Sequence, residues 1–303
     1  MSPEVSAYRF GVAEVTRIDD QSQSLFNAWI DKGYNGELEY LEKYSDIRLD
    51  PSMLLDGAKS IVVCAFPYPR PGGIKWQEGA LRIASYALGD DYHDVLRHRL
   101  SIAVQEMERK WGGQYRICID TAPLQERYWA VKSGLGYIGL NGLLMISGAG
   151  SCFFLASIIT TIEIAPDEPC ELDCGYCRRC IACCPASAII DAPPDLGKNR
   201  ILIDARKCLS CLTIEQRGEL PENVNLGNRL YGCDTCQSVC PHNRLTEALE
   251  PLREFLPRPE LLGLTKDKVL EMSHEEYCRI FKGSAIKRAK LDGLKRNASH
   301  TRR

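Results

Sequence analysis

Two cysteine-rich runs limit what this chain can fold into more than any other feature of its sequence. The first run reads CGYCRRCIACCP from Cys174, the second reads CDTCQSVCP from Cys233, and each ends in Cys-Pro. The spacing CxxCxxCxxxCP is that of bacterial two-cluster ferredoxins, in which three close cysteines bind one cubane and the fourth binds the other. The pattern therefore predicts two 4Fe-4S clusters that exchange one ligand each.

This exchange divides eight of the fifteen cysteines into two ligand sets. The predicted ligands of the first cluster are Cys174, Cys177, Cys180 and Cys240, and those of the second cluster are Cys184, Cys208, Cys233 and Cys236. Free cysteines usually pack as small apolar side chains, which is the expected role of the others. Three of these, Cys170, Cys183 and Cys211, lie near the clusters in the sequence and leave the choice of ligands open.

Other uses of the cysteines fit the sequence less well. A disulfide framework is typical of short secreted domains, whereas this chain has 303 residues and begins MSPEVSAYRFGVAEVTRIDD, without an apolar signal core or a twin-arginine leader. A zinc site pairs two CxxC motifs around one tetrahedral ion, which leaves the third cysteine and the Cys-Pro without a role. We therefore expect a cytoplasmic iron–sulfur protein.

Composition and charge narrow the class of protein further. The chain has 45% hydrophobic residues, and its most apolar run, CFFLASII at 152–159, is shorter than the roughly 18 residues that span a bilayer. We expect a soluble monomer without a membrane segment. The charge is uneven, because after Tyr277 nine Lys or Arg stand against one acid, Asp292. The alternative to a binding surface there is a solvated or frayed terminus.

Alternating helix and strand patterns precede the cysteines and predict an α+β fold. Helices are expected as a pair within 21–44, over 90–111 and from Pro123 to Gly134, and strands over 59–66, 114–120 and 151–164. The run GLGYIG follows a helix and precedes a strand, so it is not a dinucleotide fingerprint. The predicted parts are an N-terminal α/β sandwich (1–165), a ferredoxin-like double-cluster domain (166–245) and a short helical basic tail (246–303). A ferredoxin needs no such N-terminal domain, so we expect an enzyme that consumes the electrons itself.

Seven segments together resemble the epoxyqueuosine reductases, cobalamin-dependent iron–sulfur enzymes that complete queuosine in tRNA. Besides the double cluster run, they are RLDPSMLLDGAKSIV (48–62), YALGDDYHDVLRHRL (86–100), IDTAPLQERYWAVKSGLGYIGLN (119–141), ILIDARKCLSCLT (201–213), LGNRLYGCDTCQSVCPHN (226–243) and FKGSAIKRAKLDGLKRN (281–297). The resemblance runs from about Gly11 to Asn297. It implies that the epoxide of epoxyqueuosine, at the wobble position, is reduced to the cyclopentene of queuosine. It also implies Cys208 rather than Cys211 as a ligand, because RKCLSCLT matches the family at its first cysteine.

Asp120 is the predicted general acid of this reaction. It ends a predicted strand, where α/β enzymes display catalytic groups, and the resemblance places the family's proton donor on it. We expect burial against the corrin to raise its pKa, because an acid must stay protonated near neutral pH in order to donate. The alternative is that Asp120 caps a helix that starts at Pro123.

The resemblance implies a base-off cobalamin with no protein histidine on the cobalt. DYHDVL at 91–96 begins like the corrinoid motif DxHxxG but lacks its glycine, so we do not expect His93 to bind cobalt. By position, the implied cobalamin contacts fall on Arg48, Ala84, Asp120, Leu144, Leu155, Ser210 and Asp234. Arg48 would otherwise be a surface salt-bridge partner, and the two leucines would be core residues.

The resemblance also gives the basic tail a role in binding the anticodon stem-loop of tRNA, where cationic side chains contact phosphates. The predicted contacts are Arg217, Arg229, Lys287, Arg288, Lys290 and Arg296. Two departures from the family stand out. We expect a short form without the helical repeats that follow in many relatives, and Leu140 occupies a position where relatives often have lysine.

Two other classes of function stay open at this level. A reductive dehalogenase-like enzyme also joins a corrinoid domain to two clusters, but such enzymes usually carry a twin-arginine leader. An electron-transfer protein would need neither Asp120 nor the basic tail. The sequence does not identify the protein that donates the electrons.

Overall fold

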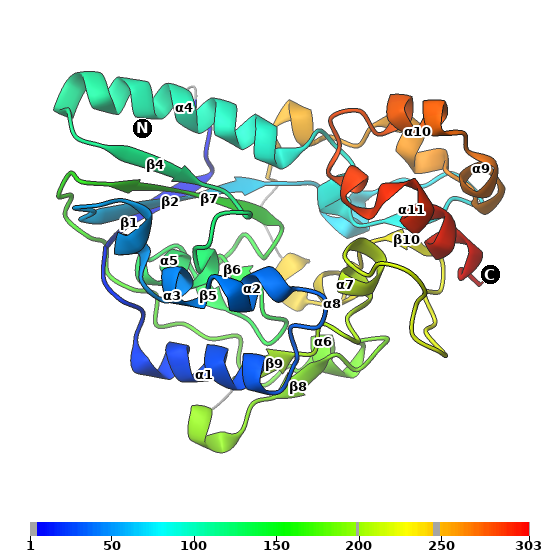
Figure 1. The fold of residues 1–303 in the computed structure, drawn as a ribbon, viewed down its shortest axis with the longest axis horizontal. Coiled ribbons are helices and arrows are strands. Elements are labelled where there is room, and N and C mark those ends of the chain that lie inside the picture. Colours follow the sequence, from blue (N-terminus) through cyan, green and yellow to red (C-terminus); the bar gives the residue numbers. More distant parts are fainter. Residues whose placement is uncertain (1–4, 198–199, 245–248, 303) are drawn as a thin grey trace.

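The computed structural model, which describes residues 5–197, 200–244 and 249–302, is built around one four-stranded sheet (Figure 1). The strand order is β1 (Arg9–Glu14), β2 (Ser60–Pro67), β7 (Phe153–Thr160) and β4 (Tyr115–Cys118). Each neighbouring pair of strands is antiparallel. Helices packed on an antiparallel sheet make the fold α+β, as the sequence predicts.

The sheet is buried on both faces because a helix layer covers each face (Figure 1). Side chains alternate between the faces along β2, and its eight residues are all buried. Ile61, Val63 and Ala65 belong to one core, and Val62, Cys64 and Phe66 belong to the other. On the first face α5 (Glu126–Lys132) packs Trp129, and on the second α4 (Tyr92–Trp111) packs Leu96 and Leu100. These two helices therefore fix the ends of the strands that carry the site described below.

The N-terminal elements follow the predicted order with one wrong boundary. The predicted helix pair is α1 (Asp20–Asp31) and α2 (Glu39–Lys43), followed by α3 (Ser45–Leu49). The helix predicted from Pro123 begins at Glu126 instead, because residues 119–125 form a turn. Asp120 lies in this turn, so the alternative that it caps the helix is wrong.

The cysteine-rich segment contains short elements held together by loops. They are α6 (Arg179–Ala182), β8 (Ile189–Asp191), β9 (Ile201–Ile203), α7 (Leu209–Ile214), β10 (Arg229–Tyr231) and α8 (Thr235–Ser238). β8 and β9 form an antiparallel pair, as do β5 (Tyr137–Ile138) and β6 (Leu144–Met145) in the glycine-rich turn. β10 instead pairs in parallel with β3 (Arg82–Ile83), which ties the cysteine-rich segment to the N-terminal part.

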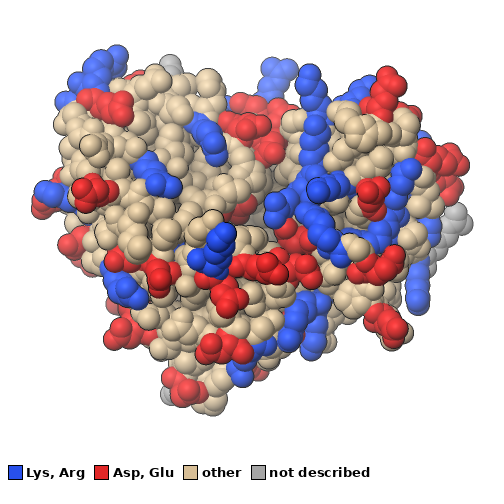
Figure 2. All heavy atoms as spheres, in the orientation of Figure 1, with Lys and Arg blue, Asp and Glu red and all other residues tan. Residues whose placement is uncertain are grey.

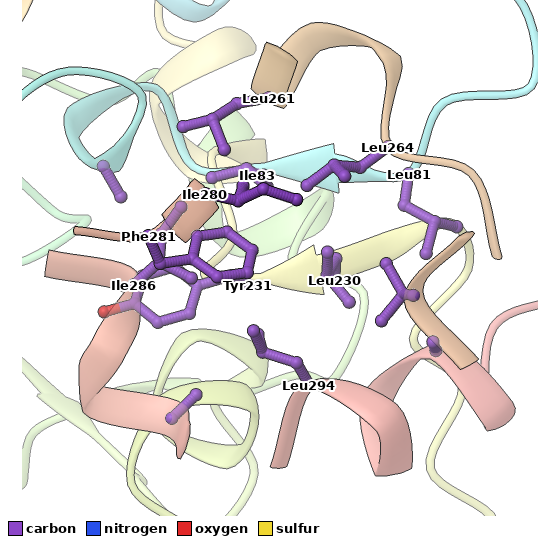
Figure 3. Close-up of a cluster of buried hydrophobic side chains, with 14 of the residues drawn as sticks. Leu81, Ile83, Leu230, Tyr231, Leu261, Leu264, Ile280, Phe281, Ile286 and Leu294 are labelled. Carbon is purple, nitrogen blue, oxygen red and sulfur yellow. The ribbon is translucent and has the colours of Figure 1, made fainter. Parts of the chain in front are cut away.

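The C-terminal helices complete a third core around this strand pair. They are α9 (Lys266–Glu271), α10 (His274–Ile280) and α11 (Lys290–Ser299). Figure 3 shows Leu294 of α11 beside Leu230 of β10, with Ile83 of β3 in the same cluster. Asn297 is fully buried and donates hydrogen bonds to the carbonyls of Thr213 and Leu230, at 2.8 and 2.9 Å. Without these bonds, buried polar groups would be left unpaired. The tail is therefore a packed element up to residue 302 and not a frayed end.

The three-part division 1–165, 166–245 and 246–303 remains our proposal for how the chain is organised. One hydrophobic core contains Leu81 and Leu88 of the first part, Leu230 of the second, and Leu261 and Leu294 of the third. The parts are therefore packed together and do not have separate cores throughout. Within the described ranges, none of the helices combines the length and apolarity that crossing a bilayer requires.

Candidate active site and cluster sites

Asp120 is held in the turn after β4 by contacts to its side chain and its backbone. Its φ is +45°, in the left-handed region that aspartate tolerates better than most residues. Oδ2 of its carboxylate accepts a hydrogen bond from the phenol of Tyr92 at 2.8 Å and lies 3.2 Å from Nε2 of His93. The backbone N–H of Asp120 donates to the carboxylate of Glu126 at 2.7 Å. The turn therefore directs this carboxylate toward the start of α4.

The start of α4 is built to present Tyr92 and His93 to Asp120. Asp91 is the N-cap, with its carboxylate accepting from the backbone N–H of His93 at 3.1 Å and bonding Nδ1 of the same ring at 2.8 Å. This leaves Nε2 to face Asp120. The Tyr92 ring stacks on the His93 ring, with centroids 4.1 Å apart, and on Phe154 of β7, at 4.4 Å. Capping and stacking thus fix both side chains before any ligand binds.

The charge of Asp120 depends on its hydrogen-bond partners. Desolvation would raise the pKa of Asp120, but hydrogen bonds from His93 and Tyr92 and the charge of His93 outweigh it, so its pKa lies below the ordinary value. The expected rise of the Asp120 pKa depends on burial against a bound corrin and stays a prediction.

The protons are held by the neighbours of Asp120. Desolvation would lower the pKa of His93, yet its hydrogen bonds to Asp120 and Asp91 raise it from 6.5 to about 9. Burial, together with the charge of Asp120, raises the pKa of Glu126 to about 8. At neutral pH the group therefore contains a charged histidine, an ionised Asp120 and a protonated Glu126.

Sequence reasoning missed Tyr92, His93 and Glu126 as site residues. The sequence suggests His93 only as a possible cobalt ligand, whereas its ring bonds two carboxylates. The available signal was Asp91 two residues before a histidine at a helix start, which is a capping pattern that also reaches a ring nitrogen. No sequence pattern indicates a role for Glu126, because its hydrogen bond with the backbone of Asp120 depends on the turn between them.

Arg48 lies close to this group and is buried. Arg48 is 5% exposed, and its guanidinium lies over the Tyr40 ring, 5.9 Å from the ring centroid. Its positive charge interacts favourably with Tyr40, Glu126 and Asp120. Within the described residues, its Nε has no hydrogen-bond partner. The alternative that Arg48 is a surface salt-bridge residue is therefore wrong, and a buried donor without a partner is suited to a polar group of a bound ligand.

Ala84, Cys233 and Asp234 line a polar pocket of about 380 Å³. Asp234 accepts a hydrogen bond from the backbone N–H of Ser85 at 2.8 Å, and burial raises its pKa to about 6. Other lining residues include Trp76 and Arg82, whose guanidinium lies over the indole at 4.9 Å. Nη1 of Arg82 has no hydrogen-bond partner among the described residues. An unpaired arginine donor in a polar pocket fits a polar or anionic group of a cobalamin.

The other predicted cobalamin contacts do not line this pocket. Leu144 of β6 is buried in the core that α5 covers, and Leu155 of β7 packs against that core. Ser210 is half-buried in the first turn of α7, two residues after the predicted ligand Cys208. The structure thus leaves these three as less direct candidates than Arg48, Ala84 and Asp234.

The predicted ligands of the first cluster line one cavity. Cys174, Cys177, Cys180 and Cys240 all contribute to its wall. The backbone N–H of Leu140 donates to Sγ of Cys174 at 3.4 Å, the type of bond that tunes a cluster. Because this contact comes from the backbone, leucine in place of lysine preserves it. Across the described ranges, no three His, Cys, Asp or Glu side chains are arranged to hold a single metal ion.

The predicted ligands of the second cluster also lie together. Burial raises the pKa of the Cys208 thiol, and the nearby Cys233 and Cys184 raise it further. Burial likewise raises the pKa of Cys236, with Cys233 and Cys208 as its nearest charged neighbours. Burial also raises the pKa of Cys211, and the thiol of Cys208 and the carboxylates of Glu215 and Glu37 raise it further. This arrangement favours Cys208 over Cys211 as the ligand.

Four of the predicted tRNA contacts are arginines that bond within the protein. Arg288 pairs with Glu215 at 2.6 Å, Arg217 donates to the carbonyl of Arg288, Arg229 donates to Thr235, and Arg296 donates to carbonyls of the segment 212–218. Lys287 and Lys290 are exposed, and neither has an ion-pair partner among the described residues. Figure 2 shows Lys and Arg gathered over the C-terminal helices, bordered by Asp and Glu.

The fold and these sites define a class of protein, a two-cluster iron–sulfur oxidoreductase. Residues 48–121 match the family model Epoxyqueuosine reductase QueG, DUF1730, and residues 173–243 match a 4Fe-4S double cluster binding domain. Epoxyqueuosine reductase of Cyclobacterium marinum is 39% identical over 293 residues, which are 95% of this chain and 90% of that protein. The chain belongs to the epoxyqueuosine reductase family.

Solved structures agree with this assignment. A crystal structure of epoxyqueuosine reductase with an epoxyqueuosine-modified tRNA-Tyr stem loop matches with a TM-score of 0.84 and 28% identity, covering 98% of this chain and 77% of that chain. Epoxyqueuosine reductase from Bacillus subtilis matches with a TM-score of 0.79 and 29% identity over the same shares. In that structure, a catalytic loop named for an aspartate is swung out of the active site.

The first prediction concerns the proton on His93. Its ring should titrate near pH 9 in an NMR titration, and Asp120→Asn should move the midpoint toward 6.5, because the carboxylate favours the charged ring. A raised folded-state pKa stabilises the protein fully below about pH 6.5, and the contribution is lost as the pH rises through about 9. Tyr92→Phe, which keeps both carboxylates, is the control. A wild-type midpoint near 6.5 would contradict the assignment.

The second prediction separates the two candidate ligands on α7. Cys208→Ser should lower the iron content of anaerobically purified protein from about eight atoms per chain toward about four, because one cubane loses a ligand. Cys211→Ser, three residues along the same helix, should keep about eight and an unchanged visible spectrum. Loss of iron from Cys211→Ser alone would reverse the assignment.

Proposed function

We propose that this protein reduces epoxyqueuosine to queuosine at the wobble position of tRNA, using cobalamin and two 4Fe-4S clusters. The observation that carries the proposal is the carboxylate of Asp120, bonded to Tyr92 and His93 in a chain that also gathers two sets of four thiols. The family member solved with an epoxyqueuosine-modified stem loop supports the substrate. We further propose that the protein acts in the cytoplasm, because its substrate is tRNA. We also propose that it acts as a monomer.

The reaction requires two electrons and two protons for each epoxide. Both C–O bonds of the epoxide break, a C=C bond forms, and the oxygen leaves as water. When bound, cobalamin supplies a strongly reducing cobalt centre for this chemistry, and the clusters pass it electrons. We assign the corrinoid to Arg48, Ala84, Asp120, Leu144, Leu155, Ser210 and Asp234, with the unpaired donor of Arg48 as the best supported contact.

Asp120 delivers the proton, and His93 supplies it. The imidazolium keeps its proton at neutral pH, and its Nε2–H lies 3.2 Å from Oδ2 of Asp120. A ligand that covers Asp120 would add desolvation, which raises the pKa of its carboxyl toward that of His93 and lets the proton move to Oδ2. The carboxylic acid formed in this way donates to the leaving oxygen. Asp91 bonds the opposite ring nitrogen and stabilises the charged ring. The catalytic aspartate loop of the Bacillus subtilis relative supports a role for the turn that carries Asp120.

The tRNA surface is assigned to the C-terminal helices. Lys287 and Lys290 are free to contact phosphates, whereas Arg288 and Arg296 position the backbone that carries them. Arg217 and Arg229 extend the surface in the same supporting role. The electron donor stays outside this proposal.

The third prediction tests the acid. Asp120→Asn should lower the rate of queuosine formation on epoxyqueuosine-containing tRNA by roughly 100-fold or more, because an amide cannot relay the proton. Nucleoside analysis by mass spectrometry measures the rate, and the visible spectrum checks that cobalamin is still bound. Asp94→Asn, an exposed acid on α4, is the matched control and should leave the rate unchanged. An Asp120→Asn protein with bound cobalamin and the wild-type rate would eliminate this role.

The fourth prediction tests the tRNA surface. Replacing Lys287 and Lys290 with alanine should weaken tRNA binding and reduce the slope of log affinity against log salt by roughly 0.7 to 0.9 for each phosphate that a lysine no longer neutralises. Lys110→Ala, in the last turn of α4 and remote from α11, is the control (Figure 1). An unchanged salt slope in the double variant would place the tRNA elsewhere.

A further inference from the structure

A threonine side chain lies between an arginine and a predicted ligand of the second cluster. Oγ1 of Thr235 is 3.4 Å from Sγ of Cys233, and it accepts a hydrogen bond from Nη2 of Arg229 at 2.8 Å. The same guanidinium donates through Nη1 to the carbonyl of Leu226 at 3.0 Å, which fixes its orientation. Arginine, hydroxyl and ligand sulfur thus form one short chain of contacts.

The hydroxyl must be the donor in this contact when a cluster is bound. A free thiol can donate to a hydroxyl, whereas a cysteine that ligates iron is a thiolate and can only accept. Oγ1 of Thr235 already accepts from Arg229, and no other acceptor for its O–H is found among the described residues. In the cluster-bound protein the O–H of Thr235 is therefore directed at Sγ of Cys233.

Helix capping does not account for this hydroxyl. Thr235 is the first residue of α8, and a threonine at a helix start often accepts from a backbone N–H of the first turn. The N-cap of α8 is Asp234, whose carboxylate accepts instead from the backbone N–H of Ser85 at 2.8 Å. The hydroxyl of Thr235 contacts the arginine and the ligand sulfur, so its proton is free for the sulfur.

The contact differs in kind from two other hydrogen bonds to predicted ligand sulfurs. Sγ of Cys174 accepts from the backbone N–H of Leu140 at 3.4 Å, and Sγ of Cys184 accepts from that of Ala188 at 3.3 Å. Backbone donors of this type are supplied by the fold, whichever side chains the residues carry. The donor at Cys233 is a side chain, so the identity of residue 235 decides whether this bond exists.

A hydrogen bond to a ligand sulfur changes the reduction potential of a cluster. When one electron is added, the negative charge on the sulfurs rises, and a donated hydrogen bond becomes stronger. The positive charge of Arg229 polarises the hydroxyl of Thr235 and acts in the same direction. Loss of the hydroxyl should therefore make the cluster harder to reduce.

We propose that Thr235, held by Arg229, is a positioning residue that acts through Cys233 and raises the reduction potential of the second cluster. One electron is added in this reduction, and no bond is formed or broken. Cys233 and Thr235 line the polar pocket that also contains Ala84, so the effect falls on the cluster beside the proposed corrinoid site. A higher potential favours the presence of the electron next to that pocket. The inference rests on the proposed function only in requiring that the second cluster is present.

The test is a reductive titration of the anaerobically purified holoenzyme with dithionite, without tRNA, followed by electron paramagnetic resonance of the reduced clusters. Two midpoints are expected, and the one lost in Cys208→Ser belongs to the second cluster. Thr235→Val should shift the reduction equilibrium of that cluster on the order of tenfold, a fall of about 59 mV for a one-electron couple, and leave the first cluster unchanged. Thr235→Ser, which keeps a hydroxyl, should keep the wild-type midpoint.

Two further variants separate the hydroxyl from its surroundings. Arg229→Met should lower the same midpoint, because the hydroxyl loses the charge that polarises it. Ser238→Ala removes an exposed hydroxyl from the same helix and should change neither midpoint. Iron analysis checks that each of these variants holds about eight atoms. If Thr235→Val loses iron, Arg229→Met, which lies outside the ligand run, replaces it in the titration.

Other outcomes overturn the inference. An unchanged second midpoint in Thr235→Val would show that the hydroxyl has no effect on the cluster, and an equal fall in Thr235→Ser would assign the effect to packing. A shift of the first midpoint alone would show that Thr235 acts on the other cluster. An unchanged midpoint in Arg229→Met would overturn the role of the arginine. Queuosine formation by the wild type tests the proposed function separately, because the titration needs neither tRNA nor turnover.

Discussion

The exchange of one cysteine between two ligand sets is the constraint on which the rest of the structure depends. In the predicted ligand sets, Cys184 of the first run joins Cys233, and Cys240 of the second run joins Cys174. Two segments some fifty residues apart are therefore held side by side. The parallel pairing of β10 with β3 then places Cys233 beside Ala84 of the N-terminal part. Electron transfer and catalysis are brought together by this one strand pair and the core around it.

In the acid site, the protons are held by the neighbours of Asp120 and not by Asp120 itself. Asp120 is ionised because His93 and Tyr92 bond its carboxylate, and the same bond to Asp120 helps to keep His93 charged. A buried, neutral acid would hold its proton alone, as the sequence-based expectation assumed. Here the proton is held by a base of higher pKa next to a carboxylate that can pass it on.

Charged side chains in the C-terminal part serve two purposes that their sequence does not distinguish. Arg288 and Arg296 bond Glu215 and backbone carbonyls, and they hold α11 against the cysteine-rich segment. Lys287 and Lys290 stay exposed on the same helices. Arginine suits the first role because its planar fork can satisfy several acceptors at once, whereas lysine carries one compact, strongly hydrated charge.

The sequence alone determined the cluster chemistry, the α+β class and the choice of Asp120 as the candidate acid. Cysteine spacing is dictated by the geometry of the cubane, and strand and helix periods are local, so both can be recognised without a structure. The tertiary structure alone decided which charges meet. His93, Glu126 and Arg48 come from three separate elements, and their pKa values and burial depend on a turn in which Asp120 adopts a left-handed conformation. Because electrostatic interactions act through space and not along the chain, local patterns predict only the pairing of Asp91 with His93, and the contacts of Asp120 with His93 and Glu126 depend on the fold.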